Sequence, residues 1–171
     1  MNIKLINLKV ISILRAFGDI VLPVKIEDIA KSLGLRVLPY PLGDDVSGLL
    51  SIENGNGTIG YNQAEPKVRR RFTIAHELGH FVLHKDKSHL FVDKQFIYRS
   101  QQSNNTPVNQ VMEQEANFFA SAILMPSEPL RGHIEKMHID LGSEESIKEL
   151  AKMFEVSTTA MSVRISQLGL L

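Results

Sequence analysis

The sequence contains no cysteine among its 171 residues. This absence excludes disulfide scaffolds, thiol nucleophiles and every metal site built on thiolates. Histidine and carboxylate are therefore the remaining strong ligands for a metal ion. The chain also lacks a surplus of either charge, because 19 lysines and arginines balance 19 aspartates and glutamates. No overall field favours nucleic acid or an anionic membrane, which leaves only a local basic patch as a possible attraction.

Long uninterrupted hydrophobic runs are absent as well. The apolar stretch over residues 3–17 is broken by Lys4, Lys9 and Arg15, which argues against a signal-peptide core or a membrane-spanning helix. We therefore expect a cytoplasmic protein with no membrane partner. With 43% hydrophobic and 22% charged residues, the composition is typical of a globular chain, and a chain of this length can bury its own core.

Hydrophobic periodicity predicts an α+β protein. Apolar residues recur at helical spacing in seven segments, which are residues 3–17, 26–33, 66–84, 108–125, 128–137, 144–154 and 158–168. Three β-rich runs predict strands over residues 35–40, 46–52 and 58–61, with a hairpin turn at residues 53–57. The polar stretch over residues 85–107 is expected to hold one strand in its middle and a mobile loop at 103–107.

The five residues from His76 to His80 read His-Glu-Leu-Gly-His and match the HExxH pattern. Residues four apart on a helix lie on one face, one turn apart, so both imidazoles can reach a single tetrahedral zinc ion. Glu77 is offset enough not to ligate, yet close enough to take the proton of an attacking water as a general base. The alternative interpretation of so short a match is two surface histidines on an amphipathic helix.

A catalytic zinc site also needs a third protein ligand and an open fourth position. Asp86 stands where a metzincin-like pattern places that ligand, but Leu83 replaces the glycine at which the chain would turn. His84 continues the row of histidines, yet three along one straight helix would spread over about 12 Å and could not share one ion. We therefore expect His84 to be a cation at the helix C-terminus and seek the ligand on the next helix.

Glu113 is the candidate on that next helix. It shares one stripe with Ala116, Asn117 and Ala120, whose small members allow a neighbouring helix to approach closely. Asn117 lies one turn beyond Glu113, where it could hydrogen-bond the outer nitrogen of a zinc-bound histidine. Glu115 points to another side, so only one of the two glutamates can face the metal, and we choose Glu113. For either glutamate alone, a solvent-exposed helix face is the alternative.

Together these segments resemble the ImmA/IrrE family of metallo-endopeptidases. The resemblance rests on residues 71–80, which contain the HExxH pattern, on residues 113–120, and on Leu124, Met125 and Pro126. With the strand end at residues 60–62 it covers residues 25–130, and residues 147–168 are similar to the helical end of those proteins. It implies a zincin-like, gluzincin-like core of α+β class in which a small β-sheet packs on the HExxH helix, followed by a mostly helical C-terminal part.

The resemblance further implies a zinc-dependent endopeptidase with the zinc ion bound by His76, His80 and Glu113. Its implied substrate is a helix-turn-helix transcriptional repressor of a phage or mobile element. We accordingly expect a metallopeptidase domain over residues 1–130, including the N-terminal helices, and a helix-turn-helix-like extension over residues 131–171. The alternative is a non-catalytic module, stabilised by its metal, that relieves repression by binding a regulator. An intact Glu77 favours the enzyme.

Two parts of the enzyme hypothesis concern the substrate. An edge strand near residues 58–61 is expected to hold the substrate extended. The donor that would stabilise an oxyanion stays unassigned, because five residues could each supply it and a surface or packing role is the favoured alternative for each. They are Tyr40, Tyr61, Tyr98, His133 and His138.

The C-terminal segment over residues 147–168 reads as a helix-turn-helix-like pair. Its second helix carries a single cation, Arg164, so contacts with phosphates would be few. We therefore expect the pair to pack within the protein or dock a partner, and direct DNA binding is the less favoured alternative.

Overall fold

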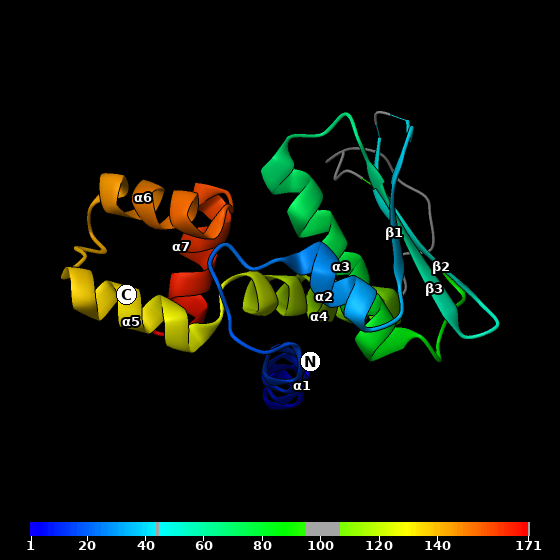
Figure 1. Cartoon of the computed structure of the whole chain (residues 1–171), viewed down its shortest axis with the longest axis horizontal. Coiled ribbons are helices and arrows are strands. Elements are labelled where there is room, and N and C mark those ends of the chain that lie inside the picture. The colour runs from blue at the N-terminus through cyan, green and yellow to red at the C-terminus, as the bar shows by residue number, and fades with distance from the viewer. Residues whose placement is uncertain (44, 95–106, 171) are drawn as a thin grey trace.

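The computed structural model describes residues 1–43, 45–94 and 107–170. These residues form seven helices and one four-stranded sheet, which confirms the predicted α+β class (Figure 1). The elements in chain order are α1 (Ile3–Phe17), α2 (Ile26–Ser32), β1 (Arg36–Tyr40), β2 (Val46–Glu53), β3 (Asn56–Asn62), α3 (Lys67–His84), β4 (Leu90–Lys94), α4 (Pro107–Leu124), α5 (Ser127–Met137), α6 (Glu144–Phe154) and α7 (Thr158–Gln167).

The predicted elements agree with the observed ones to within one or two residues at most ends. The strand expected in the middle of residues 85–107 is β4. The loop predicted over residues 103–107 lies outside the described residues except for Pro107, which begins α4. None of the helices in the described ranges is long and apolar enough to cross a membrane.

The sheet has the strand order β1-β3-β2-β4. Strand β3 pairs in parallel with β1 and antiparallel with β2, so it is an interior strand. The prediction of an edge strand near residues 58–61 is therefore wrong. The turn at residues 53–57 predicts the β2–β3 hairpin, but the local sequence does not show that β1 pairs with the other side of β3. Among the described residues, β4 pairs with β2 alone and forms the opposite edge.

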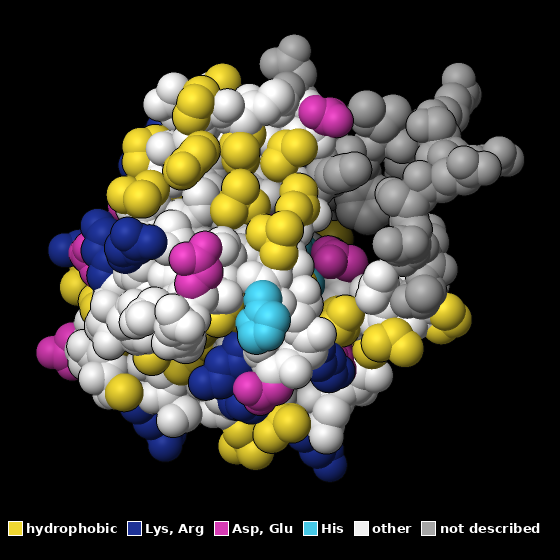
Figure 2. Space-filling model, turned by 90° about the vertical axis from the view of Figure 1, so that its right-hand side faces the viewer, with side chains coloured by type: hydrophobic (Ala, Val, Ile, Leu, Met, Phe, Trp, Pro, Cys, Tyr) yellow, Lys and Arg dark blue, Asp and Glu magenta, His cyan; other side chains and the backbone are white. Residues whose placement is uncertain are grey.

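The elements are stacked as the sheet, α3 and α4, with α1 against α4 and the helices α5 to α7 gathered to one side (Figure 1). One face of the sheet packs on α3 through Leu50, Ile52 and Ile59, which are buried. The other face carries exposed apolar side chains, and Figure 2, which views the molecule from the side of the sheet, shows hydrophobic side chains gathered there. They include Leu38, Tyr40, Leu90 and Val92.

Helices α3 and α4 approach each other closely at Gly79. A Cβ atom on Gly79 would lie 3.2 Å from the Cα and carbonyl oxygen of Ala116 and 3.1 Å from the ring of Phe119. Because these distances are tighter than ordinary contacts, a side chain at Gly79 would push α4 outward. The glycine within the HExxH pattern therefore sets the distance at which α4 faces α3.

Helix α7 is tied to the end of α4 by a buried arginine. Arg164 of α7 is only 2% exposed, and its Nε donates to the carbonyl oxygen of Met125 at 3.0 Å. Its guanidinium also lies 5.9 Å from the ring centre of Phe118. Arg164 is thus engaged inside the protein rather than offered to a phosphate. The division into domains at residue 130 stays a prediction.

Gly48 of β2 provides a test of how tightly the sheet packs on α3. A Cβ atom there would overlap Cγ2 of Thr73 on α3, which is buried, and would lie 3.1 Å from the carbonyl oxygen of Gly60. We expect Gly48→Ala to lower the free energy of unfolding by about 1–3 kcal/mol, as overpacking does, in urea titrations. In a Thr73→Ser background, which lacks that methyl group, the same substitution should cost clearly less. Equal costs in both backgrounds would show that the methyl group is not the obstacle.

Candidate metal centre

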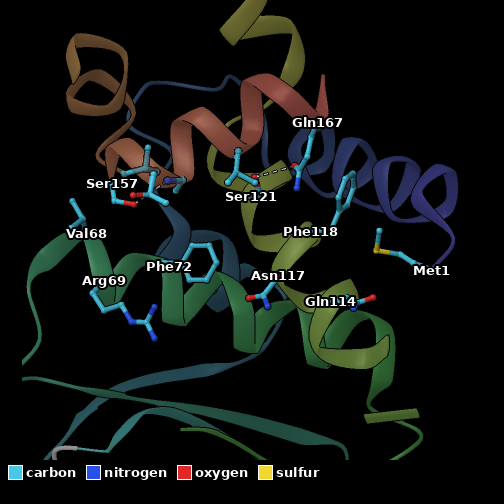
Figure 3. A pocket seen from close by; sticks show the side chains of 14 residues that line it. Met1, Val68, Arg69, Phe72, Gln114, Asn117, Phe118, Ser121, Ser157 and Gln167 are labelled. Carbon is cyan, nitrogen blue, oxygen red and sulfur yellow. Dashed lines mark hydrogen bonds between the residues drawn. The ribbon is translucent and has the colours of Figure 1, made fainter. Parts of the chain in front are cut away.

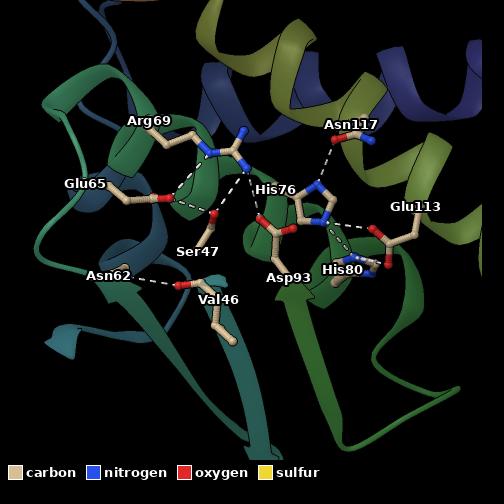
Figure 4. Close-up of polar contacts among 10 residues, drawn as sticks. All are labelled: Val46, Ser47, Asn62, Glu65, Arg69, His76, His80, Asp93, Glu113 and Asn117. Atoms are coloured by element: carbon tan, nitrogen blue, oxygen red, sulfur yellow. Dashed lines mark hydrogen bonds and ion pairs between the residues drawn. The ribbon is translucent and has the colours of Figure 1, made fainter. Parts of the chain in front are cut away.

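His76 and His80 of α3 and Glu113 of α4 meet in one cluster (Figure 4). The Nε2 atoms of the two histidines lie 3.1 Å apart. The carboxylate of Glu113 lies 3.2 Å from Nε2 of His76 and 3.3 Å from Nε2 of His80. Both imidazoles are buried, whereas the Glu113 side chain is 47% exposed, so the cluster is open on one side. Two imidazole nitrogens and one carboxylate gathered in this way could hold a metal ion.

The outer ring nitrogen of His76 has a hydrogen-bond partner on α4. Nδ1 of His76 lies 3.0 Å from Oδ1 of Asn117, one turn beyond Glu113 on α4. An amide oxygen only accepts, so Nδ1 of His76 donates to it, and Nε2 is the ring nitrogen that faces the cluster. The structure thus brings Asn117 to the position that sequence reasoning anticipated.

Glu77 is fully buried beside the cluster, and neither of its carboxylate oxygens has a hydrogen-bond partner among the described residues. Strand β2 covers it, since a Cβ atom on Gly48 would lie 3.6 Å from Oε1 of Glu77. Burial disfavours the charged form and raises the pKa of Glu77 to about 8, against the opposing influence of His76. A buried carboxylate without a partner is costly to keep, which points to a group that the described residues do not supply.

The titration behaviour of Glu113 is opposite to that of Glu77. Burial alone would raise its pKa, but the adjacent imidazoles of His76 and His80 outweigh burial and hold the pKa well below its ordinary range. Glu113 is therefore ionised at neutral pH, and it gives the cluster a permanent negative charge.

His84 differs from its prediction as a helix C-terminal cation. It is only 1% exposed and lies between His80 and Glu115, with its Nδ1 3.2 Å from Nδ1 of His80 and its Nε2 3.1 Å from Glu115. Burial lowers the pKa of His84 in spite of the nearby carboxylate, so it is neutral at pH 7. The prediction was wrong because α4 covers the end of α3, which the sequence of α3 does not reveal.

Asp93 and Arg69 are polar neighbours of the cluster that sequence reasoning missed. A carboxylate oxygen of Asp93, on β4, lies within 4.8 Å of ligand atoms of His76 and Glu77. Arg69 lies two turns before His76 on α3, with its Nη2 4.0 Å from Asp93 and 3.1 Å from Oγ of Ser47 (Figure 4). Arg69 and His76 are seven residues apart and therefore share one face of α3, so the sequence could have placed Arg69 near the cluster. Nothing in the sequence around Asp93 connects Asp93 to the HExxH pattern.

A pocket of about 490 Å³ opens beside the cluster, between α3, α4 and α7 (Figure 3). Asn117 lines this pocket as well as contacting His76, so the two sites adjoin. Its walls are mostly apolar and include Val68, Phe72, Phe118, Ala160 and Val163, with Arg69 at one side.

Of the five candidate oxyanion donors, the four that the structure describes are not brought to this site. Tyr98 lies outside the described residues. Tyr40 and Tyr61 belong to strands β1 and β3, and His133 and His138 belong to α5 and its C-terminal cap. None of these four lines the pocket or belongs to the His-His-Glu cluster.

Comparisons with known proteins relate this chain to a family and to a known fold. Residues 30–166 match the family model described as the IrrE N-terminal-like domain, Peptidase_M78. The chain is 34% identical over 105 residues to the radiation response metalloprotease IrrE of Deinococcus radiodurans. The aligned region covers 61% of this chain and 29% of that protein. The fold is similar to that of a Mycobacterium tuberculosis transcriptional regulator, with a TM-score of 0.66 and 16% identity over 94% of this chain and 46% of the other. The chain therefore spans less than half the length of both relatives.

The pKa of Glu77 predicts a pH-dependent cost in the metal-free protein. Folding raises this pKa from an ordinary value near 4.5 to about 8, so the stability linked to the proton is complete below pH 4.5 and is lost as the pH rises toward 8. Glu77→Gln stays neutral at every pH. The free energy of unfolding of this variant minus that of the wild type should therefore increase by roughly 1 kcal/mol per pH unit between pH 5 and 8. Urea unfolding with a chelator measures this, with the exposed Glu149→Gln as a control. A constant difference across that range would contradict the raised pKa.

Proposed function

This chain belongs to the IrrE N-terminal-like domain family of metallopeptidases, and from that premise we propose that it is a zinc-dependent endopeptidase. One observation carries the proposal. The buried carboxylate of Glu77, which has no partner among the described residues, lies directly beside the cluster of two imidazoles and a carboxylate. A purely structural site would have no need of a buried carboxyl group without a hydrogen-bond partner at that point.

The donor set fits a zinc ion. His76 and His80 would bind it through Nε2 and Glu113 through its carboxylate, which is the two-histidine, one-carboxylate set of catalytic zinc sites with room for a fourth ligand. When bound, zinc supplies polarisation of the scissile carbonyl and a lowered pKa for a water. Asn117 holds the ring of His76 in the orientation that this binding needs.

Glu77 is the proposed catalytic base. Its position beside the cluster lets it take the proton of the attacking water. The same group can then return the proton to the amine that leaves. Strand β2 and the bulk of α3 exclude water from its other sides.

The substrate would be a protein segment held in extended form. Within the described residues β4, which contains Asp93, is an edge strand of the sheet. The backbone groups on the outer side of β4 can pair with a substrate strand. The adjoining apolar pocket can take side chains of that segment. In this proposal β4, rather than the strand near residues 58–61, holds the substrate in extended form.

We further propose that the substrate is a helix-turn-helix repressor of a phage or mobile element, as the family resemblance implies. Such a substrate would place the protein in the cytoplasm. Direct DNA binding by the C-terminal helices stays the less favoured alternative, since Arg164, the cation of α7, is buried. A binding module without catalysis is the competing function, and the experiments below separate the two.

Zinc binding is the first test. The purified protein should bind about one zinc ion per chain, and His76→Ala or His80→Ala should abolish binding because each removes one of three ligands. Glu113→Ala should weaken it strongly. Equilibrium dialysis with metal analysis gives the stoichiometry, and His89→Ala, an exposed histidine, serves as the matched control. Absence of bound zinc from the wild type supplied with the metal would refute the metal centre.

Catalysis is tested through Glu77→Gln, which keeps the shape of the side chain and removes the base. The variant should retain zinc and bind a repressor encoded beside its gene, but lose nearly all cleavage, because a neutral amide cannot accept the proton. Gel analysis of cleavage and a binding assay with the same repressor are compared. If wild type and variant relieve repression equally, with no cleavage product in either case, the binding module replaces the enzyme.

A further inference from the structure

A buried chain of two hydrogen bonds leads outward from His80 to α4. Nδ1 of His80 lies 3.2 Å from Nδ1 of His84, and Nε2 of His84 lies 3.1 Å from Oε2 of Glu115. The two imidazoles are 1% exposed, and the Glu115 side chain is 18% exposed. The contact therefore occupies the protein interior on the side of His80 that faces away from Glu113.

The chemistry of the acceptor at the end of this chain fixes the direction of both hydrogen bonds. A carboxylate accepts and does not donate, so Nε2 of His84 donates to Glu115. When His84 carries a single ring proton, that proton is on Nε2, so its Nδ1 is a bare acceptor and Nδ1 of His80 donates to it. His80 can then present the lone pair of Nε2 to a metal ion, and Nε2 is the atom that lies 3.3 Å from Glu113.

His76 reaches the same state by a different route. Its Nδ1 donates to the amide oxygen of Asn117, again leaving Nε2 toward the cluster. Helix α4 thus provides Glu113 on the inner side, a partner for His76 directly, and a partner for His80 through a second imidazole.

We propose that His84 and Glu115 are positioning residues that hold His80 in the tautomer and ring orientation needed to bind metal through Nε2. The inference rests on the metal centre of the proposed function. It assigns a role in metal affinity to two residues that touch neither the metal position nor Glu77. A competing explanation is that His84 only fills space between α3 and α4.

Two substitutions at His84 separate these explanations because they rank in opposite order. His84→Phe keeps the ring volume but removes the acceptor, whereas His84→Asn loses volume but places an amide oxygen near the former Nδ1, as Asn117 does for His76. A positioning role predicts that His84→Phe weakens zinc binding by about 10- to 100-fold and that His84→Asn restores most of it. A packing role predicts the reverse order.

The measurement is the zinc dissociation constant, from competition with a chromophoric chelator, at unchanged stoichiometry. Glu115→Ala should weaken zinc less than His84→Phe, since the His80–His84 contact survives it, and His89→Phe should have no effect. Urea unfolding of each metal-free variant checks the fold. Equal affinity of His84→Phe and wild type would overturn the proposal while leaving the zinc site intact, whereas loss of zinc from the wild type itself would overturn the proposed function.

A second measurement needs no substitution. Nitrogen-15 NMR of the zinc-loaded wild type reports which ring nitrogen carries the proton. We expect the proton on Nδ1 of His80 and on Nε2 of His84. A proton on Nδ1 of His84, with Nε2 bare, would reverse the hydrogen bonds and overturn the proposal even if the variants fail to fold.

Discussion

The close contact of α3 with α4 at Gly79 and Ala116 is the constraint on which the proposed metal centre depends. No side chain stands between the two backbones there, because even a methyl group on Gly79 would lie 3.2 Å from the backbone of Ala116. Glu113 and Asn117 flank that contact on α4, and their short side chains reach the imidazoles of α3 only because the helices are so near. Glycine in the HExxH pattern is thus a packing requirement as much as a feature of the motif.

Around this contact the protein buries several polar groups within an apolar interior. Most of them are paired: His76 with Asn117, His80 with His84, and His84 with Glu115. Glu77 differs, since its oxygens have no partner in the described part of the chain. A stable fold would gain from pairing or removing such a group, and its retention is the physical mark of a site shaped for chemistry rather than for stability.

The C-terminal helices extend the same interior. Arg164 fixes α7 to the end of α4 through the Met125 carbonyl, and Ala160 and Val163 of α7 form a wall of the pocket beside the cluster. Their helix-turn-helix-like sequence is therefore used to shape a surface next to α3. A helix-turn-helix-like pair does not by itself imply the DNA binding for which that motif is known in other proteins.

The sequence alone determined the local features of this protein. Helical and strand periodicity placed the element boundaries, and the i, i+4 spacing put His76 with His80 and Glu113 with Asn117 on single helix faces, because these relations depend only on backbone geometry within one element. The tertiary structure decided which elements meet. It made β3 an interior strand, covered His84 so that it is neutral, and brought Asp93 beside His76. Such outcomes depend on neighbours distant in the chain, and a pattern of apolar residues shows which face is covered but not what covers it.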